Sequence, residues 1–159
     1  MHANNPLPAI ILTAVGSRRQ FALHQLGQRA VLIVHNQHTY QAAVAVNPAV
    51  RKIYPSAAEV LIVSVFDAPE VPRLLRGVAE GFMEQAYHQA AASLPDGFAP
   101  AEYVILLPDW EGRVRRALGF APVNQQAGIA IVDSAGFVVA QYQGADPAGF
   151  ATGALAAAA

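Results

Sequence analysis

The clearest pattern in the chain is a pair of short, unbroken apolar runs, "AVLIV" at residues 30–34 and "VLIVSVF" at residues 60–66. Runs of this length that are rich in β-branched residues are typical of strands buried on both faces of a sheet. Three later segments are predicted as strands, at residues 103–107, 128–132 and 137–143. The last two are separated by the turn sequence "DSAG" and therefore predict a hairpin.

Segments whose apolar residues have helical spacing lie between these predicted strands. Residues 73–94 predict the longest helix, because apolar side chains recur every three or four positions. These are Leu74, Leu75, Val78, Phe82, Met83, Ala86, Tyr87 and Ala90. Residues 40–54 predict a helix that breaks at Pro48, since an internal proline removes a backbone hydrogen bond and clashes with the preceding turn.

The remaining segments predict smaller elements. We expect a short hairpin within residues 9–23, a loop over 94–102 and a short helix over 111–118 that Gly119 closes. An alanine-rich helix should begin at Pro147 and fray over residues 156–159. Strands that alternate with helices predict an α/β fold, with a mixed, mainly parallel central sheet flanked by helices.

Composition narrows the class of protein. With 159 residues, of which 54% are hydrophobic, the chain is long enough for one core, and we expect a single domain over residues 1–159. The charged fraction is 13% and the net charge is -1, so the basic surface that nucleic-acid binding requires is missing. No apolar run is long enough to cross a bilayer. We therefore expect a cytoplasmic protein without nucleic-acid or membrane partners.

The chain contains no cysteine, which excludes disulfides, thiolate nucleophiles and cysteine-containing metal sites. It also lacks a Gly-x-Ser-x-Gly elbow, a glycine-rich phosphate loop and a His-Glu-x-x-His helix. The sequence therefore predicts no cofactor and contains no named enzyme motif.

Three segments carry a resemblance to a known fold: "FALHQLGQRAVLIV", "VILLPDWEGRVRRALGF" and "GIAIVDSAGFVV". Together with the order of elements, they resemble the thioredoxin-like fold, and most closely its peroxiredoxin and alkyl hydroperoxide reductase branch. The resemblance extends from about residue 9 to about residue 145. It implies a three-layer sandwich with the sheet in the middle.

The same resemblance implies that the family's catalytic groups are absent. In the family, the first central strand leads into a loop reading Pro-x-x-x-Thr-x-x-Cys, whose cysteine attacks the peroxide. Here "HNQHTYQA" places His35 at the proline, keeps Thr39 and leaves Ala42 at the position of the cysteine. The family's later arginine, which lowers the pKa of the thiol, corresponds to Ala127. Compared instead with the Trp-Cys-x-x-Cys motif of thioredoxins, the window again offers no thiol.

Six residues form the predicted binding cleft: His35, His38, Thr39, Tyr40, Asp109 and Trp110. They follow predicted strands, and in open α/β sheets ligands bind outside the carboxyl ends of the strands. Structural roles are the favoured alternative for three of them. Thr39 and Asp109 are good helix caps, and Trp110 is suited to covering the edge of the core.

A metal site is a weaker interpretation. His35 and His38 are three residues apart and would need a third ligand, for which Asp67, Asp109 or Glu111 is available. Ordinary loop histidines with local hydrogen bonds are favoured over such a site. The basic residues Arg113, Arg115 and Arg116 are interpreted as a solvated helix face.

Two hypotheses follow for function. The first is a redox-inactive thioredoxin-like protein that binds a small molecule or a protein partner. The alternative is a non-thiol enzyme rebuilt around His35, His38, Tyr40 and Asp109, with a histidine as general base or metal ligand. Convergence of these side chains on one pocket would favour the enzyme. We also expect a homodimer formed through the helix at 73–94 and the edge strand at 137–143, a pairing that the family resemblance also implies.

Overall fold

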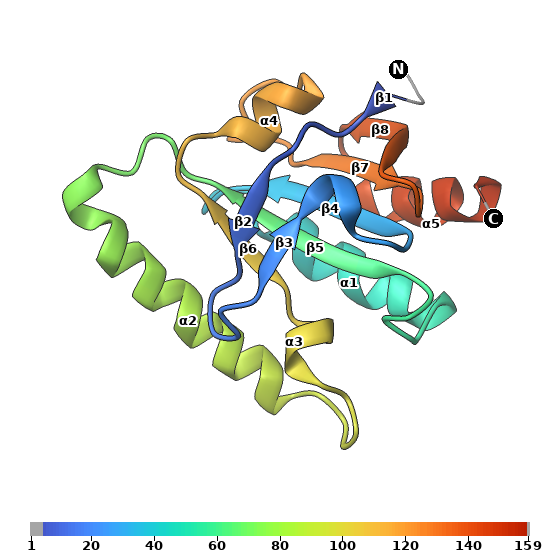
Figure 1. Cartoon of the computed structure of the whole chain (residues 1–159), viewed down its shortest axis with the longest axis horizontal. Coiled ribbons are helices and arrows are strands. Elements are labelled where there is room, and N and C mark those ends of the chain that lie inside the picture. The colour runs from blue at the N-terminus through green and yellow to red at the C-terminus, as the bar shows by residue number, and fades with distance from the viewer. Residues whose placement is uncertain (1–4, 159) are drawn as a thin grey trace.

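A computed structural model describes residues 5–158. Its main feature is a six-stranded sheet in the order β1-β8-β7-β4-β5-β6 (Figure 1). The strands are β1 (Asn5–Pro6), β4 (Ala30–His35), β5 (Leu61–Asp67), β6 (Leu106–Asp109), β7 (Gly128–Val132) and β8 (Phe137–Gln143). Strands β4, β5 and β6 are parallel neighbours, whereas β7 is antiparallel to β4 and β8 to β7. The sheet is therefore mixed, with β4, β5, β6 and β8 running in one direction.

The central strand β4 is buried along its whole length, as its apolar sequence predicts. Successive side chains of a strand point to opposite faces. Leu32 and Val34 accordingly join the apolar cluster on one face, and Val31 and Ile33 join the cluster on the other. Both faces are therefore covered, and the sheet is the middle of three layers.

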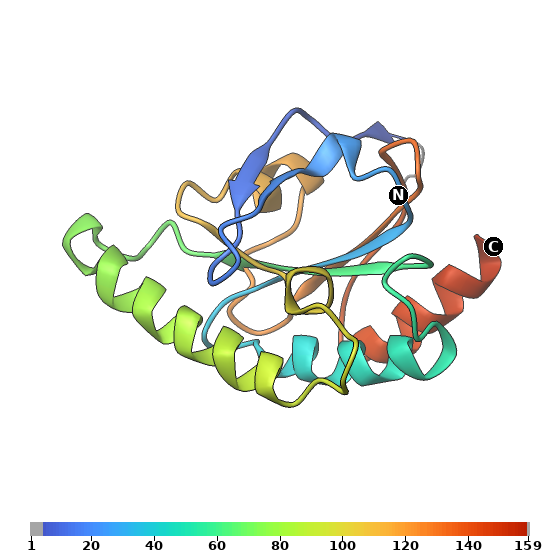
Figure 2. The same ribbon diagram turned by 60° about the horizontal axis from the view of Figure 1, so that its bottom comes forward.

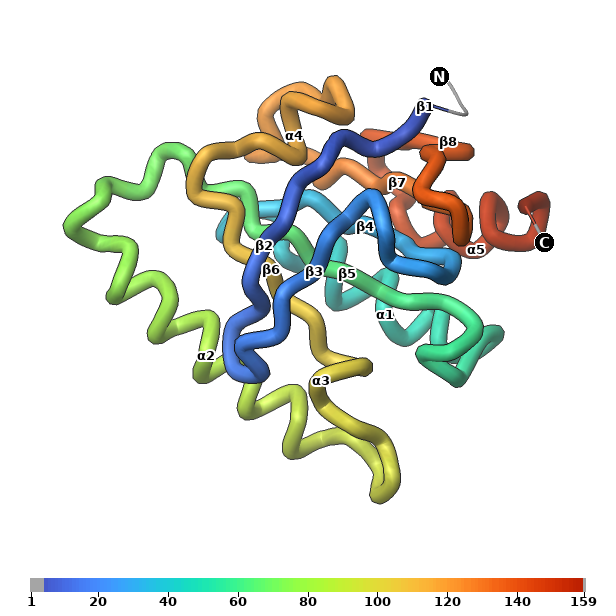
Figure 3. The backbone as a smooth tube through the Cα atoms, in the orientation of Figure 1, coloured from blue at the N-terminus to red at the C-terminus, as the bar shows by residue number. Residues whose placement is uncertain are grey.

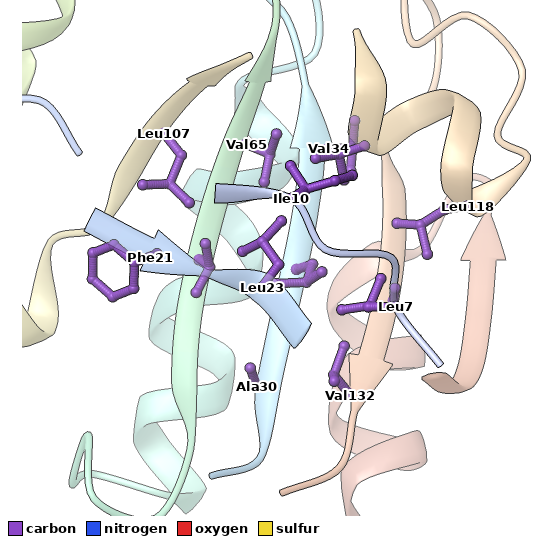
Figure 4. Packing of buried hydrophobic residues seen from close by; sticks show 14 of the residues in the cluster. Leu7, Ile10, Phe21, Leu23, Ala30, Val34, Val65, Leu107, Leu118 and Val132 are labelled. Atoms are coloured by element: carbon purple, nitrogen blue, oxygen red, sulfur yellow. The ribbon is translucent and has the colours of Figure 1, made fainter. Parts of the chain in front are cut away.

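One outer layer contains the hairpin of β2 (Ile11–Thr13) and β3 (Gln20–Ala22), the single turn η1 (Leu23–Gln25) and the helix α4 (Arg113–Leu118). The hairpin lies within the range expected from the sequence, residues 9–23. Figure 4 shows Leu23 of η1 and Leu118 of α4 meeting side chains of the sheet, together with Leu7 and Ile10 from the segment between β1 and β2.

The other outer layer contains α1 (Gln41–Ile53), α2 (Arg76–Ala92) and α5 (Pro147–Ala157), which lie together on one side of the sheet in Figure 2. Helices α1 and α5 bury Val46, Val50, Ala151 and Leu155 against it. Helix α2 lies farther out, beside β6, as the trace in Figure 3 shows. Its only buried residues are Met83 and Tyr87.

Three predicted elements are corrected by the structure. Helix α1 continues through Pro48 without a break. The carbonyl that Pro48 leaves without a donor is that of Val44, and both residues are exposed, so water can satisfy it. The predicted loop at 94–102 contains the start of a one-turn helix, α3 (Pro100–Tyr103), which begins with a proline as helices often do. Because Tyr103 ends this turn, β6 starts at Leu106 and extends to Asp109.

The remaining differences are at element ends. Helix α2 is preceded by a 3-10 turn, η2 (Arg73–Leu75), and α5 includes Ala156 and Ala157 from the predicted frayed tail. Ala159 lies outside the described residues. Strand β8 is not a free edge over its first two residues, because Val138 and Phe137 pair with Asn5 and Pro6 of β1.

Candidate functional site

An open groove of about 940 Å³ lies between α1 and α2. Its floor comes from β5, through Ser64 and Phe66, and from the start of β6, through Leu106. The sides come from the helices, through residues such as Val44, Met83, Ala86 and Tyr87. The groove exists because α2 stands away from the sheet and leaves part of this face uncovered.

The lining of the groove is uncharged. Of residues 5–158, none of the aspartates, glutamates, lysines or arginines lines it. Its polar side chains are His35, Gln37, Tyr40, Asn47, Ser64, Tyr87, Ser93 and Tyr103. A mainly apolar surface with a few polar groups is typical of sites that bind small molecules.

His35 is the most enclosed polar group of the groove. It is the last residue of β4, and strand alternation turns it to the same face as Val31 and Ile33. Its ring meets the Phe66 ring edge to face, with centroids 6.0 Å apart. Nδ1 lies 3.3 Å from the carbonyl oxygen of Asn36, and Nε2 is buried without a hydrogen-bond partner in the described chain. Burial lowers the pKa of His35, opposed by the Asn36 carbonyl, so the ring is neutral at pH 7.

Thr39 is buried in the loop between β4 and α1 and does not cap the helix. Its hydroxyl accepts a bond from the Asn36 amide at 3.1 Å and donates to the Val123 carbonyl at 2.8 Å. The cap position of α1 is occupied by Tyr40, without a side-chain bond. Thr39 therefore fixes the loop against the segment before β7, and the interpretation of Thr39 as an N-cap is wrong.

A second, more polar hollow of about 470 Å³ adjoins the groove. Gln37, Phe66, Ala79 and Phe82 line both spaces. The polar hollow is further lined by Asn36, His38, Asp67, Glu70, Arg115 and Asn124, among others.

Asp67 is the buried carboxylate of the polar hollow. Its Oδ2 lies 3.3 Å from Nε of Arg115, while its Oδ1 has no hydrogen-bond partner within residues 5–158. Burial raises the pKa of Asp67; the charge of Arg115 opposes this rise and that of Asp109 adds to it. Arg115 is only 20% exposed, so it does not belong to a solvated helix face as the sequence suggested. From the sequence alone, Asp67 was a candidate metal ligand, and its pairing with Arg115 was not predicted.

The structure distributes the predicted cleft residues over several environments. His35 and Tyr40 line the groove, and His38 lines the polar hollow. Asp109 lines neither space: it is buried, and its Oδ2 accepts a bond from the Val114 amide at the start of α4. Trp110 also lines neither space and lies under the guanidinium of Arg76. The four residues of the enzyme hypothesis therefore do not share one cavity.

Two further observations concern ligands and membranes. Within residues 5–158, no three histidine, aspartate or glutamate side chains are grouped so that they could hold a metal ion. The helices in this part of the chain are too short or too polar to cross a membrane.

Ala42 and Ala127 belong to one apolar cluster, formed where α1 and α5 pack against the sheet. Ala42 is the second residue of α1 and is partly buried, and Ala127 directly precedes β7 and is buried. The positions that the family resemblance assigns to the nucleophile and the arginine are therefore in the same region of the structure.

No family model and no curated protein sequence matches this chain. Several solved structures, however, are similar to it in fold. The bacterioferritin comigratory protein of Xanthomonas campestris is 16% identical with a TM-score of 0.65, covering 98% of this chain and 96% of that one. Peroxiredoxin Q of the same organism is 17% identical with a TM-score of 0.59, covering 98% and 96%. The thioredoxin domain of a thiol-disulfide oxidoreductase from Bacteroides vulgatus is 12% identical with a TM-score of 0.62, covering 98% of each chain. The predicted thioredoxin-like fold is confirmed, with peroxiredoxins among the structural neighbours.

Proposed function

We propose that this protein is a redox-inactive member of the thioredoxin-like fold that binds a small molecule in the groove between α1 and α2. The observation that carries the proposal is the uncharged groove of about 940 Å³ with the unpartnered Nε2 of His35 in its lining. Small-molecule sites have volumes of roughly 300 to 1,000 Å³ and combine apolar walls with a few polar groups. A buried nitrogen without a partner costs stability, so its retention is explained if a ligand satisfies it.

The proposal of redox inactivity rests on the chemistry of the fold's known reactions. Peroxide reduction and disulfide exchange both need a thiolate, and this chain has no cysteine. Of the structural neighbours, the bacterioferritin comigratory protein of Xanthomonas campestris has alkyl peroxide reduction activity. In this chain, alanines stand at both positions that the resemblance assigns to such a reaction, Ala42 and Ala127.

Binding is favoured over the alternative of a rebuilt enzyme for a geometric reason. General acid-base chemistry needs its groups within hydrogen-bond reach of one bound substrate. His35 and His38 line different spaces, and Asp109 is engaged with the start of α4. These groups are therefore poorly arranged for a shared reaction.

The proposal is tested by titrating the protein with the neutral fluorescent probe N-phenyl-1-naphthylamine. We expect saturable binding of one probe per chain. Ala86→Trp should weaken it at least tenfold, because Ala86 lines the groove and the indole would occupy it. Gln85→Trp is the matched control, since Gln85 is exposed and does not line the groove. Equal affinity in the two variants, or no saturable binding by the wild type, would contradict the proposal.

A further inference from the structure

The absence of charged side chains from the described lining of the groove restricts the class of ligand that it can bind. No residue between 5 and 158 with a charged side chain at neutral pH lines it, and burial keeps His35 neutral. Moving an ion from water into such a surface without a counter-charge is strongly unfavourable. An uncharged ligand is therefore favoured over a carboxylate, a phosphate or an amine.

The hydrogen bonding of His35 restricts the ligand further. The carbonyl oxygen of Asn36 only accepts hydrogen bonds, so we assign the ring proton to the neighbouring Nδ1, which lies 3.3 Å from it. In a neutral imidazole, the other nitrogen then has a free lone pair. Nε2 is thus an acceptor, and only a group with an O–H or N–H bond can satisfy it.

The position of His35 indicates where that group lies. His35 and Phe66 are at the carboxyl ends of β4 and β5, whereas Tyr103 and Val104 line the groove just before β6 begins. The groove therefore follows the sheet, with its buried acceptor toward one end and a mainly apolar lining that includes a few other polar groups. This arrangement fits a molecule with a polar end and an apolar body.

We propose that the ligand is an uncharged, largely apolar molecule whose single hydroxyl or N–H group donates a hydrogen bond to Nε2 of His35. The inference rests on the proposed function, because it names the class of ligand for the same groove. It also specifies what the ligand must not be: an ion, or a molecule that can only accept hydrogen bonds.

Three probes that share one apolar body separate these classes: 4-pentylphenol, 4-pentylanisole and 4-pentylbenzoate. At pH 7.5 the phenol is a neutral donor, the anisole is a neutral acceptor and the benzoate is an anion. Calorimetric titration of the wild type should give the phenol about three- to tenfold higher affinity than the anisole, the usual effect of one net hydrogen bond. The benzoate should bind more weakly than both.

The variant His35→Phe tests whether Nε2 causes the preference. It keeps a planar ring beside Phe66 but removes the acceptor, so the phenol and the anisole should then bind within about twofold of each other. His88→Phe is the matched control, since His88 is exposed and does not line the groove, so the same substitution there should retain the preference. In the wild type, the ¹⁵N resonance of Nε2 should shift on adding the phenol and not on adding the anisole, which tests the contact without a substitution.

The outcomes separate the two proposals. If no probe binds, both the groove function and the ligand class are wrong. If the probes bind but the phenol has no advantage, or if His35→Phe retains that advantage, the groove is a binding site and the role of Nε2 is wrong. Tighter binding of the benzoate would contradict the requirement for an uncharged ligand.

Discussion

Asp67 and Asp109 lie opposite each other where the parallel strands β5 and β6 end, yet they have different partners. Asp109 accepts a backbone bond from Val114 at 2.8 Å, and Asp67 pairs with Arg115 at 3.3 Å. One carboxylate therefore anchors the start of α4 and the other holds the middle of the same helix. The pair joins the sheet to α4, and Asp67 alone of the two lines the polar hollow.

The titration of Asp67 should appear in the pH dependence of stability. Its pKa is raised above the ordinary value of 3.8, so the folded protein binds this proton more tightly than the unfolded chain. The resulting stability is fully present below pH 3.8 and is lost as the pH rises through the folded pKa. Asp67→Asn does not ionise, so its free energy of unfolding should increase relative to the wild type between pH 4 and pH 7. Urea unfolding at several pH values measures this; a constant difference would contradict it.

His35 should have the opposite pH dependence. Its pKa is lowered below 6.5 by burial, so the folded protein binds this proton less tightly than the unfolded chain. Its contribution is fully present above pH 6.5 and is lost as the pH falls below that value. Comparing the Asp67→Asn variant with the double variant Asp67→Asn, His35→Phe isolates this effect, because Asp67 then titrates in neither protein. The wild-type histidine should become increasingly unfavourable from pH 7 to pH 5, and parallel stability curves would show that His35 is not titrating as inferred.

Arg51 should contribute substantially to stability. One of its guanidinium nitrogens donates to three carbonyls, those of Tyr54, Ser56 and Val60, between 2.8 and 3.2 Å. Arg51→Met should cost about 2 to 4 kcal/mol, because several of these carbonyls then lose their donor. The neighbouring Lys52 is exposed, so Lys52→Met should change stability by less than about 0.5 kcal/mol. Chemical denaturation compares the two, and equal losses would contradict the assigned role of Arg51.

The strands were the most predictable part of the fold. β7 and β8 match their predicted ranges, β4 extends one residue further, and β5 is shifted by one residue at each end. An apolar run that is buried on both faces is a local signal, so the sequence alone identifies it. β6 was misplaced because its start depends on the turn that ends at Tyr103.

The candidate site was predictable only in part. His35 and Tyr40 were found because they follow a strong strand signal, and both line the groove. The pair of Asp67 and Arg115 was missed because it depends on how α4 packs across the ends of β5 and β6. The apolar spacing of residues 73–94 predicted a helix correctly but did not show which of its apolar side chains would be exposed, since periodicity does not specify what covers a helix.

The exposed apolar side chains before and on α2 lead us to expect a homodimer. Leu74 is 95% exposed and Phe82 is 70% exposed, and Leu75 and Val78 beside them are more than half exposed. Exposed apolar patches of this kind mark interaction surfaces. Light scattering at micromolar concentration should therefore give a dimer for the wild type and a monomer for Leu74→Glu combined with Phe82→Glu. Gln85→Glu is the control on the same helix, and a monomeric wild type would contradict the expectation.

The alignment of the chain with peroxiredoxins can be tested by restoring the missing groups. The wild type should not accelerate peroxide consumption, because it has no thiolate. Ala42→Cys should react slowly: the start of α1 lowers the pKa of a thiol, but the partly buried apolar surroundings raise it. Adding Ala127→Arg brings a cation to the same cluster and should make the reaction faster, with a thiol pKa below about 8. Ala127→Met is the matched control, since it adds bulk to the same buried position without charge, and its stability should be measured beside that of the arginine variant. If the methionine accelerates the reaction as much as the arginine does, or if neither changes the thiol pKa, then Ala42 and Ala127 are not the counterparts of the nucleophile and its arginine.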